Sequence, residues 1–300
     1  MRGVNTLIVA LTLTIMASSC GKASKTERTE VIEGKNVVAP GAVIEKIAGG
    51  FGFTEGPAVD CEGNLYFTDE KGDTVHKLTP AGVLSTVIEN TGQGTGLYVD
   101  KNCNLLLCEQ DKAFHRLVSL DSNFEITVLA DEYDGKPLNA PNDVWVHPGG
   151  GIYFTDPNWK DTDDPSRVYY MTPDRSQLIP VIEDLEVPNG VVGSLDGKSL
   201  YVTDGRINLT YEYSIESDGT LSGKTLFAEE GEDGLTVDAE GNVYITSSGI
   251  SVYNSDGEKI ETIEVPESTS NICFGGKDMR TLYITAQTSL YAIIMNVRGL

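Results

Sequence analysis

The sequence predicts an all-β chain folded as a six-bladed β-propeller, and two repeated patterns carry this prediction. In the first, two short apolar runs flank a turn rich in Gly, Asn and Asp, which is typical of an antiparallel hairpin. The six copies lie at residues 54–70, 95–110, 142–157, 189–205, 233–248 and 271–287. Equivalent positions recur every 38 to 47 residues, which is the spacing expected of four-stranded propeller blades.

The second pattern is a further strand-like run before each hairpin, which we interpret as the outermost strand of a blade. The runs lie at residues 42–49, 84–91, 126–133, 178–185, 225–232 and 259–266. The first run precedes every blade, while the last blade ends near Met295 without an outer strand. We therefore expect residues 42–48 to complete the last blade, which closes the ring and leaves no long exposed edge.

The N-terminus, residues 1–20, has the features of an export signal. Arg2 precedes an apolar run that ends near Met16, and the small residues 17–19 stand directly before Cys20. This arrangement resembles a lipoprotein signal, although Ala17 occupies the usual Leu position; ordinary signal cleavage is the alternative. We expect a lipid on Cys20, a flexible tether over residues 21–40, and a domain over residues 41–300 in the bacterial cell envelope.

Composition narrows the classes of partner. The formal net charge is −23, which argues against nucleic acid, because nucleic-acid binding needs a basic surface. We expect a small-molecule substrate, a monomer, and contact with a membrane only through the lipid on Cys20.

The remaining cysteines do not have the spacing of a zinc site. Cys61 and Cys103 occupy equivalent turns of adjacent repeats, whereas Cys108 and Cys273 lie in apolar runs. We expect no structural disulfide, with pairing of Cys61 and Cys103 as the alternative.

The hairpin repeats also contain the candidate site, because each begins with a polar residue. In a propeller the first strand of every blade lines the central channel, so these residues should form one ring. They are Glu55, Thr95, Asn142, Asn189, Asp233 and Asn271. Oxygen-bearing side chains with two carboxylates are suited to a hard cation. The alternative is that polar residues merely favour the turn that enters each strand.

Prolines support the cation interpretation. Pro141 and Pro188 directly precede Asn142 and Asn189, and a proline stiffens the loop that presents the next residue.

At these residues the chain resembles the family of senescence marker protein, gluconolactonase and luciferin-regenerating enzyme, which are calcium-binding six-bladed propeller hydrolases. The resemblance covers residues 42–295 and is most specific at residues 54–57, 141–143, 188–190 and 233–235. It implies that Glu55, Asn189 and Asp233 hold a divalent cation, and that Asn142 contacts substrate or completes the metal shell. Ala140 departs from the family, since many sugar lactonases have Arg there.

We therefore expect a metal-dependent hydrolase of a small lactone or ester, of the gluconolactonase type. The cation is expected to be calcium, with magnesium, manganese or zinc as alternatives. Asp233 is the candidate general base and Asp143 the second candidate; Asn142, Thr95 and Asn271 are candidate substrate contacts. The chain has no Gly-x-Ser-x-Gly motif, which argues against a serine hydrolase. Phosphotriester hydrolysis at the same site, and a non-catalytic propeller with structural calcium, are the alternative functions.

Overall fold

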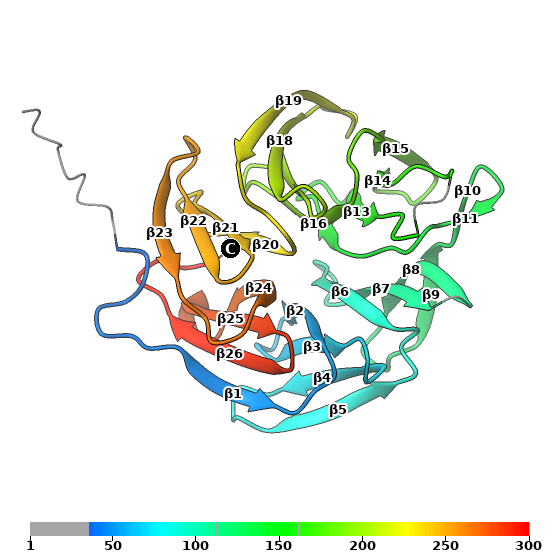
Figure 1. Cartoon of the computed structure of the whole chain (residues 1–300). Helices are drawn as coiled ribbons and strands as arrows, with labels where there is room; N and C mark the ends of the chain where they lie inside the picture. Colours follow the sequence, from blue (N-terminus) through cyan, green and yellow to red (C-terminus); the bar gives the residue numbers. More distant parts are fainter. Residues whose placement is uncertain (1–35, 112, 161–162, 300) are drawn as a thin grey trace, which may run out of the picture. The chain divides into compact units, whose positions relative to one another are not determined.

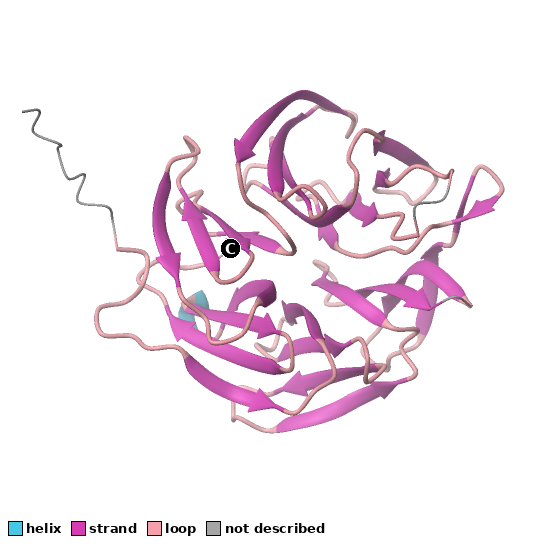
Figure 2. Ribbon diagram, viewed as in Figure 1, coloured by secondary structure: helices cyan, strands magenta, loops and turns pink. Residues whose placement is uncertain are grey.

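The computed structural model describes residues 36–299, except residues 112 and 161–162. The predicted signal and lipid site, residues 1–20, and most of the predicted tether lie outside these residues. Strands dominate the described chain, and its single short helical segment is the 3-10 turn η1 (Lys277–Met279) (Figure 2). No helix in this part of the chain is long and apolar enough to cross a membrane.

Six four-stranded antiparallel sheets form the blades, as the sequence predicts. The first blade contains β2 (Thr54–Val59), β3 (Leu65–Asp69), β4 (Thr74–Leu78) and β5 (Leu84–Glu89). The second contains β6 (Gly94–Val99), β7 (Leu105–Asp111), β8 (Phe114–Leu120) and β9 (Ile126–Ala130). The third contains β12 (Val144–Val146), β13 (Ile152–Asp156), β14 (Arg167–Met171) and β15 (Leu178–Ile182). A small hairpin of β10 (Glu132–Tyr133) and β11 (Lys136–Pro137) lies between the second and third blades in sequence.

The other three blades have the same order from the centre outward. The fourth contains β16 (Pro188–Gly193), β17 (Ser199–Asp204), β18 (Leu209–Ile215) and β19 (Leu221–Ala228). The fifth contains β20 (Leu235–Val237), β21 (Val243–Thr246), β22 (Ile250–Tyr253) and β23 (Lys259–Ile263). The sixth contains β24 (Thr269–Gly275), β25 (Thr281–Ala286), β26 (Ser289–Ile294) and β1 (Glu45–Gly49).

The predicted closure of the ring is confirmed, because β1 pairs antiparallel with β26 and completes the sixth blade (Figure 1). The contact extends beyond β1: Val38 bridges Met295, and Val37 is fully buried in the apolar core between the fifth and sixth blades. The packed domain thus begins several residues before the predicted boundary at residue 41.

Deleting residues 1–48 should prevent the domain from folding. This change removes Val37 from the core and leaves β26 as an unpaired edge strand, which favours aggregation. Solubility and thermal melting of the shortened chain test the expectation. A soluble product with a sharp melting transition would show that the closing strand is dispensable.

Apolar side chains fill the spaces between blades and fix the sheets against one another. Between the third and fourth blades, for example, Trp145 and Tyr153 pack in one cluster with Val191 and Leu200. Successive side chains of an inner strand point to opposite faces of its sheet, and most of them are buried because each face packs against a neighbouring blade.

The expectation of no structural disulfide is wrong. Cys61 and Cys103 form a disulfide between the β2–β3 turn and the β6–β7 turn, with their Cα atoms 5.9 Å apart. The inner hairpin turns of adjacent blades lie side by side, which brings these two cysteines together although 42 residues separate them. Cys108 and Cys273 are free, as their positions in apolar strands suggest.

Candidate active site

Five of the six predicted ring residues line one cavity of about 420 Å³. They are Glu55, Thr95, Asn142, Asn189 and Asp233. Each lies at the start of an inner strand or just before it, and neighbouring inner strands contact one another around the ring. The repeat therefore brings together side chains that are far apart in the sequence.

Asn271, the sixth predicted ring residue, does not line this cavity. Its Nδ2 donates a hydrogen bond of 3.4 Å to Oε2 of Glu55, and its Oδ1 accepts one from the Ile272 N–H. It borders a second cavity of about 240 Å³, which is lined mostly by apolar residues of the inner strands. The structure thus places Asn271 behind Glu55, where it orients that carboxylate.

Asp143, the second candidate base, also borders the smaller cavity and not the larger one. Its two carboxylate oxygens accept hydrogen bonds from the backbone N–H groups of Val144 (2.9 Å) and Val191 (3.2 Å). Asp143 therefore ties the third blade to the fourth. Asp233 is the candidate base that the cavity exposes.

Threonines at the ends of the second strands fix the backbone of the ring. The hydroxyl of Thr68 donates a hydrogen bond to the carbonyl of Thr95. In the same way, Thr155 donates to the carbonyl of Asn189, and Thr203 donates to the carbonyl of Asp233. Each bond runs from one blade to the ring residue of the next. Cys108 occupies the equivalent position in the second blade, and there Thr95 itself donates to the carbonyl of Asn142 at 2.8 Å.

Aspartates that follow three of these threonine positions hold the loops that lead into the ring. Asp69 accepts the N–H groups of residues 52 and 53, ahead of Glu55. Asp156 accepts those of residues 139 and 140, ahead of Asn142, and Asp204 accepts those of residues 186 and 187, ahead of Asn189. A carboxylate that receives two backbone N–H groups fixes the loop strongly, because these are charge-assisted hydrogen bonds. In the fifth blade Ser247 stands at this position.

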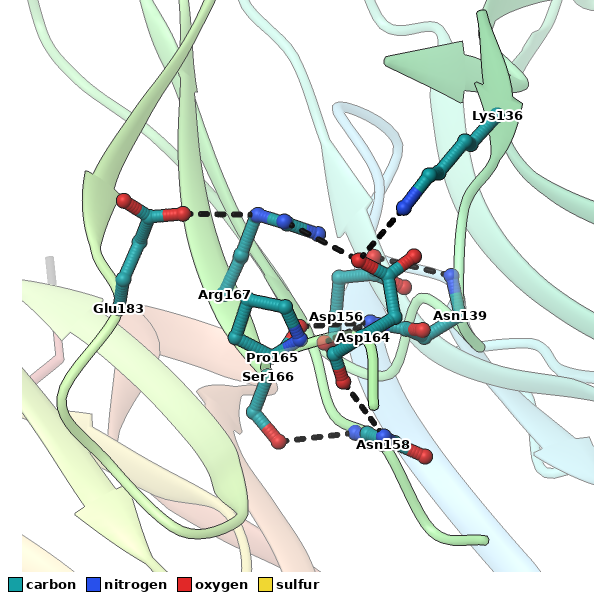
Figure 3. Close-up of polar contacts among 9 residues, drawn as sticks. All are labelled: Lys136, Asn139, Asp156, Asn158, Asp164, Pro165, Ser166, Arg167 and Glu183. Carbon is teal, nitrogen blue, oxygen red and sulfur yellow. Dashed lines mark hydrogen bonds and ion pairs between the residues drawn. The ribbon is translucent and has the colours of Figure 1, made fainter. Parts of the chain in front are cut away.

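Figure 3 shows the loop network around Asp156. Arg167 connects Asp164 with Glu183, and the Ser166 hydroxyl donates to the carbonyl of Glu186. Asn158 donates from its side chain to the carbonyl of Asp164. These contacts join the described ends of the segment that carries Trp159 to the loop that leads to Asn189.

Glycines that follow ring residues allow the inner strands to approach closely. A Cβ added to Gly56, whose φ is 45°, would lie 2.1 Å from the carbonyl oxygen of Thr95. A Cβ on Gly190 would lie 2.6 Å from the carbonyl oxygen of Asp233. Real side chains do not tolerate such distances, so these positions require glycine for the ring to keep its diameter.

Burial governs the electrostatics of the ring. Burial raises the pKa of Glu55 to about 8, with a further contribution from the negative charge of Asp143. Burial also raises the pKa of Asp233 well above its ordinary value, and the nearby charges of Glu55 and Asp143 raise it further. Burial and mutual repulsion thus disfavour the ionised forms of both carboxyl groups, and a bound cation would favour those forms.

The donor set fits a hard divalent cation. Oδ1 of Asn189 is buried and has no hydrogen-bond partner in the described part of the chain, while its Nδ2 donates to the carbonyl of Glu232 at 3.0 Å. A buried carbonyl oxygen without a donor is costly unless something binds it. With the carboxylates of Glu55 and Asp233 it supplies the oxygen ligands that calcium prefers.

Only two of these candidate ligands are acidic. Across the described residues, no three His, Cys, Asp or Glu side chains are grouped so that they could hold a metal. A cation at the ring would therefore depend on the amide oxygen of Asn189, with Asn142 as a further ligand.

Four other residues line the cavity and were not predicted: Phe53, Glu70, Gln110 and Trp159. Glu70 and Gln110 occupy equivalent repeat positions at or just beyond the end of a second strand. The second strand runs antiparallel to the first, so its end returns to the edge where the ring residues lie. Their position at the end of the second strand could therefore have identified Glu70 and Gln110 from the sequence. The residue type at this position differs from blade to blade, so no repeated residue marks it.

The family described as "SMP-30/Gluconolactonase/LRE-like region" matches residues 53–288. Lactonase drp35 of Staphylococcus haemolyticus is 29% identical over 174 residues, which cover 55% of this chain and 52% of the relative. The chain thus spans about half the length of the curated relatives that it matches.

Two solved structures resemble the chain over most of its length. A proposed gluconolactonase is 31% identical with a TM-score of 0.82, over 88% of this chain and 96% of that one. A gluconolactonase from Xanthomonas campestris is 27% identical with a TM-score of 0.80, over 86% of this chain and 91% of that one. The chain therefore belongs to the SMP-30/gluconolactonase/LRE-like family.

Proposed function

We propose that this protein hydrolyses a small lactone or ester in the larger cavity with the help of a divalent cation, calcium being the best match. The observation that carries the proposal is the convergence of the buried Glu55 carboxyl group, the half-buried Asp233 carboxyl group and the unpartnered Asn189 Oδ1 on one cavity. Relatives named lactonase and gluconolactonase support the reaction class.

Glu55, Asn189 and Asp233 would hold the cation, with Asn142 as a substrate contact or fourth ligand. A bound divalent cation supplies Lewis-acid polarisation of the ester carbonyl. Thr95 and Gln110 lie on the cavity wall, and Gln110 Nε2 donates to Thr95 Oγ1 at 3.4 Å. In this proposal these two side chains would bind the ring oxygen or the hydroxyl groups of a substrate.

Asp233 accepts the proton of the attacking water in this proposal. The water oxygen forms a bond to the carbonyl carbon, the acyl carbon–oxygen bond breaks, and the proton passes to the alkoxide that leaves. The raised pKa of Asp233 makes its carboxylate a stronger base than an ordinary aspartate. Water and one lactone give one hydroxy acid, without any oxidant or further reactant.

The test is a hydrolysis assay on metal-stripped protein with calcium added back. Gluconolactone, γ-butyrolactone and a phosphotriester are compared under the same conditions. We expect calcium-dependent opening of at least one lactone and a slower reaction, or none, with the phosphotriester. Calcium binding without any hydrolysis would favour a binding propeller instead, and faster phosphotriester hydrolysis would reverse the assigned reaction.

The pH dependence of stability gives an independent test of the buried carboxyl groups. Between the ordinary pKa of 4.5 and the raised value of about 8 for Glu55, the cation-free folded protein holds more protons than the unfolded chain. Its free energy of unfolding should therefore fall as pH rises through this window. Calcium binds the ionised carboxylates, so it should raise the melting temperature more near pH 8 than near pH 5.

Thermal melting in chelator and in calcium at both pH values measures this difference. Glu55→Gln should make the increase caused by calcium small at both values. An equal increase in the parent protein at the two pH values would contradict the assignment.

A further inference from the structure

The cavity contains a carboxylate that the proposed hydrolysis does not use. Glu70 is half-buried and lines the cavity. Its backbone is fixed, since its N–H donates to the carbonyl of Phe53 at 2.9 Å and its own carbonyl accepts the N–H of Asp73. Within the described residues its carboxylate has neither a hydrogen-bond donor nor an ion-pair partner. A half-buried carboxylate on a cavity wall without a protein partner is available to a ligand.

Two aromatic rings line the same cavity. Phe53 is half-buried, and Trp159 keeps 42% of its surface exposed. The faces of aromatic rings attract cations, with Trp the strongest, and the attraction grows when the site is partly shielded from water. A carboxylate together with aromatic rings is the combination of groups that recognises an alkylammonium ion.

The chain already places an ammonium group on one of these rings. Lys71 Nζ lies 5.1 Å from the centre of the Phe53 ring. Lys71 is exposed and does not line the cavity. Burial raises the pKa of Glu70, and the positive charge of Lys71 opposes this increase. The Phe53 ring and the Glu70 carboxylate therefore both interact with an ammonium group in this protein, that of Lys71.

The charge of the cavity wall favours the same ligand. Among its described lining residues are three carboxyl groups, those of Glu55, Glu70 and Asp233, and no Lys, Arg or His. A divalent cation at the ring would compensate Glu55 and Asp233, whereas the charge near Glu70 is that of the exposed Lys71, which lies outside the cavity lining. An anionic substituent would be repelled there, and a cationic one attracted.

We propose that Glu70, Phe53 and Trp159 form a subsite for a positively charged alkylammonium substituent of the substrate. The subsite selects cationic lactones over neutral and anionic lactones of equal size. The substituent occupies the subsite while the reacting carbonyl lies at the ring residues. That the cationic ligand is a substrate rests on the proposed function. Binding of the ammonium group at the subsite does not require hydrolysis.

The binding test uses two probes of the same shape, choline and dimethylbutanol, in which carbon replaces the charged nitrogen. The full chain is titrated calorimetrically with each probe in the presence of calcium. Choline should bind about tenfold more tightly than dimethylbutanol, the size expected of a cation on partly shielded aromatic rings beside a carboxylate. Equal affinities, or no binding of choline, would overturn the proposal.

Variants separate the subsite from general surface charge. Glu70→Gln keeps the shape of the side chain and should remove most of the preference for choline, and Trp159→Leu should reduce it. Glu89→Gln neutralises an exposed carboxylate on β5, in the same blade but outside the cavity, and should leave the preference unchanged. An unchanged preference in Glu70→Gln, or the same loss in Glu89→Gln, would show that the subsite does not exist.

A kinetic test distinguishes failure of the subsite from failure of the proposed function. Three γ-butyrolactones are compared, bearing a trimethylammonium, a tert-butyl or a carboxylate group at the same position. We expect kcat/KM to fall in that order, and Glu70→Gln to bring the first two within about twofold of each other. Hydrolysis of all three at equal rates overturns the subsite alone. Absence of hydrolysis with all three refutes the proposed function, and the choline titration then decides the subsite by itself.

Discussion

Replacing Asp233 by Asn should abolish calcium binding and hydrolysis together while the propeller remains folded. The substitution removes one of the two carboxylates at the ring and also the candidate base, yet it keeps the size of the side chain. Because the affinity of calcium sites depends on the number of charged ligands, we expect a loss of roughly 100-fold or more in affinity. Calorimetric titration of metal-stripped protein measures affinity, and thermal melting in chelator reports on the fold.

Asp238→Asn is the matched control in the same blade. Asp238 is fully buried and lies in the turn between β20 and β21. It accepts hydrogen bonds from the Asn242 N–H and the Tyr244 hydroxyl. Its replacement should lower stability and leave calcium affinity almost unchanged. Full calcium affinity in Asp233→Asn would show that the cation does not bind at the ring.

Replacing Asp204 by Asn should weaken calcium binding although Asp204 does not line the cavity. Its Oδ2 accepts the Glu186 N–H at 2.8 Å and its Oδ1 the Val187 N–H at 2.9 Å. An Asn side chain keeps one acceptor and turns an NH₂ group toward the other N–H, so the loop that leads to Asn189 loses a bond. Residues that orient metal ligands typically contribute 10–100-fold in affinity, and we expect a loss of that order.

Calcium affinity and melting temperature, measured together, show whether Asp204 positions the metal ligand Asn189 or only stabilises the fold. Asp204→Asn should lower calcium affinity much more than Asp238→Asn does, even where the two lower the melting temperature equally. A loss of stability without a change in affinity would mean that Asp204 only supports the fold. Equal losses of affinity in both variants would mean that general loosening, and not the loop, controls the site.

The sequence predicts the blades and the closing strand because both depend on a repeated pattern. Each hairpin has its own turn residues, and Asp60, Asp100 and Asp238 each accept two N–H groups of the following turn. Such local bonds are encoded within a few residues. Burial of one face by neighbouring blades then selects the register.

The parts that the sequence does not predict arise from contacts between blades. The repeat places Cys61 and Cys103 in equivalent turns, but their pairing also requires these turns to lie within disulfide distance, and the sequence does not give that distance. Asn271 begins its repeat like the other ring residues, yet Ser270 holds the ring position, since Thr246 donates to the Ser270 carbonyl as Thr203 does to that of Asp233. Asn271 instead corresponds to Asp143, because the N–H group of each donates to a threonine hydroxyl of the second strand, that of Thr285 or Thr155. Its side chain therefore lies behind Glu55 and not on the cavity wall.

The wall of the cavity is the least predictable part of the site. Glu70 and Gln110 are equivalent in the repeat but chemically different, and Trp159 lies on a segment without a counterpart in the other blades. The repeat conserves the geometry that holds the ring. The proposed subsite uses positions where the blades differ, so the repeated pattern that predicts the fold does not predict these residues.

The pairing of β1 with β26 also has a consequence for the order of folding. β1 is the first strand of the domain to be synthesised and its partner is the last, so the contact spans almost the whole domain. Such a non-local contact has a high entropic cost until the intervening blades are formed. β1 therefore stays unpaired until five blades have formed. We expect the pairing of β1 with β26 to be a late and slow step of folding.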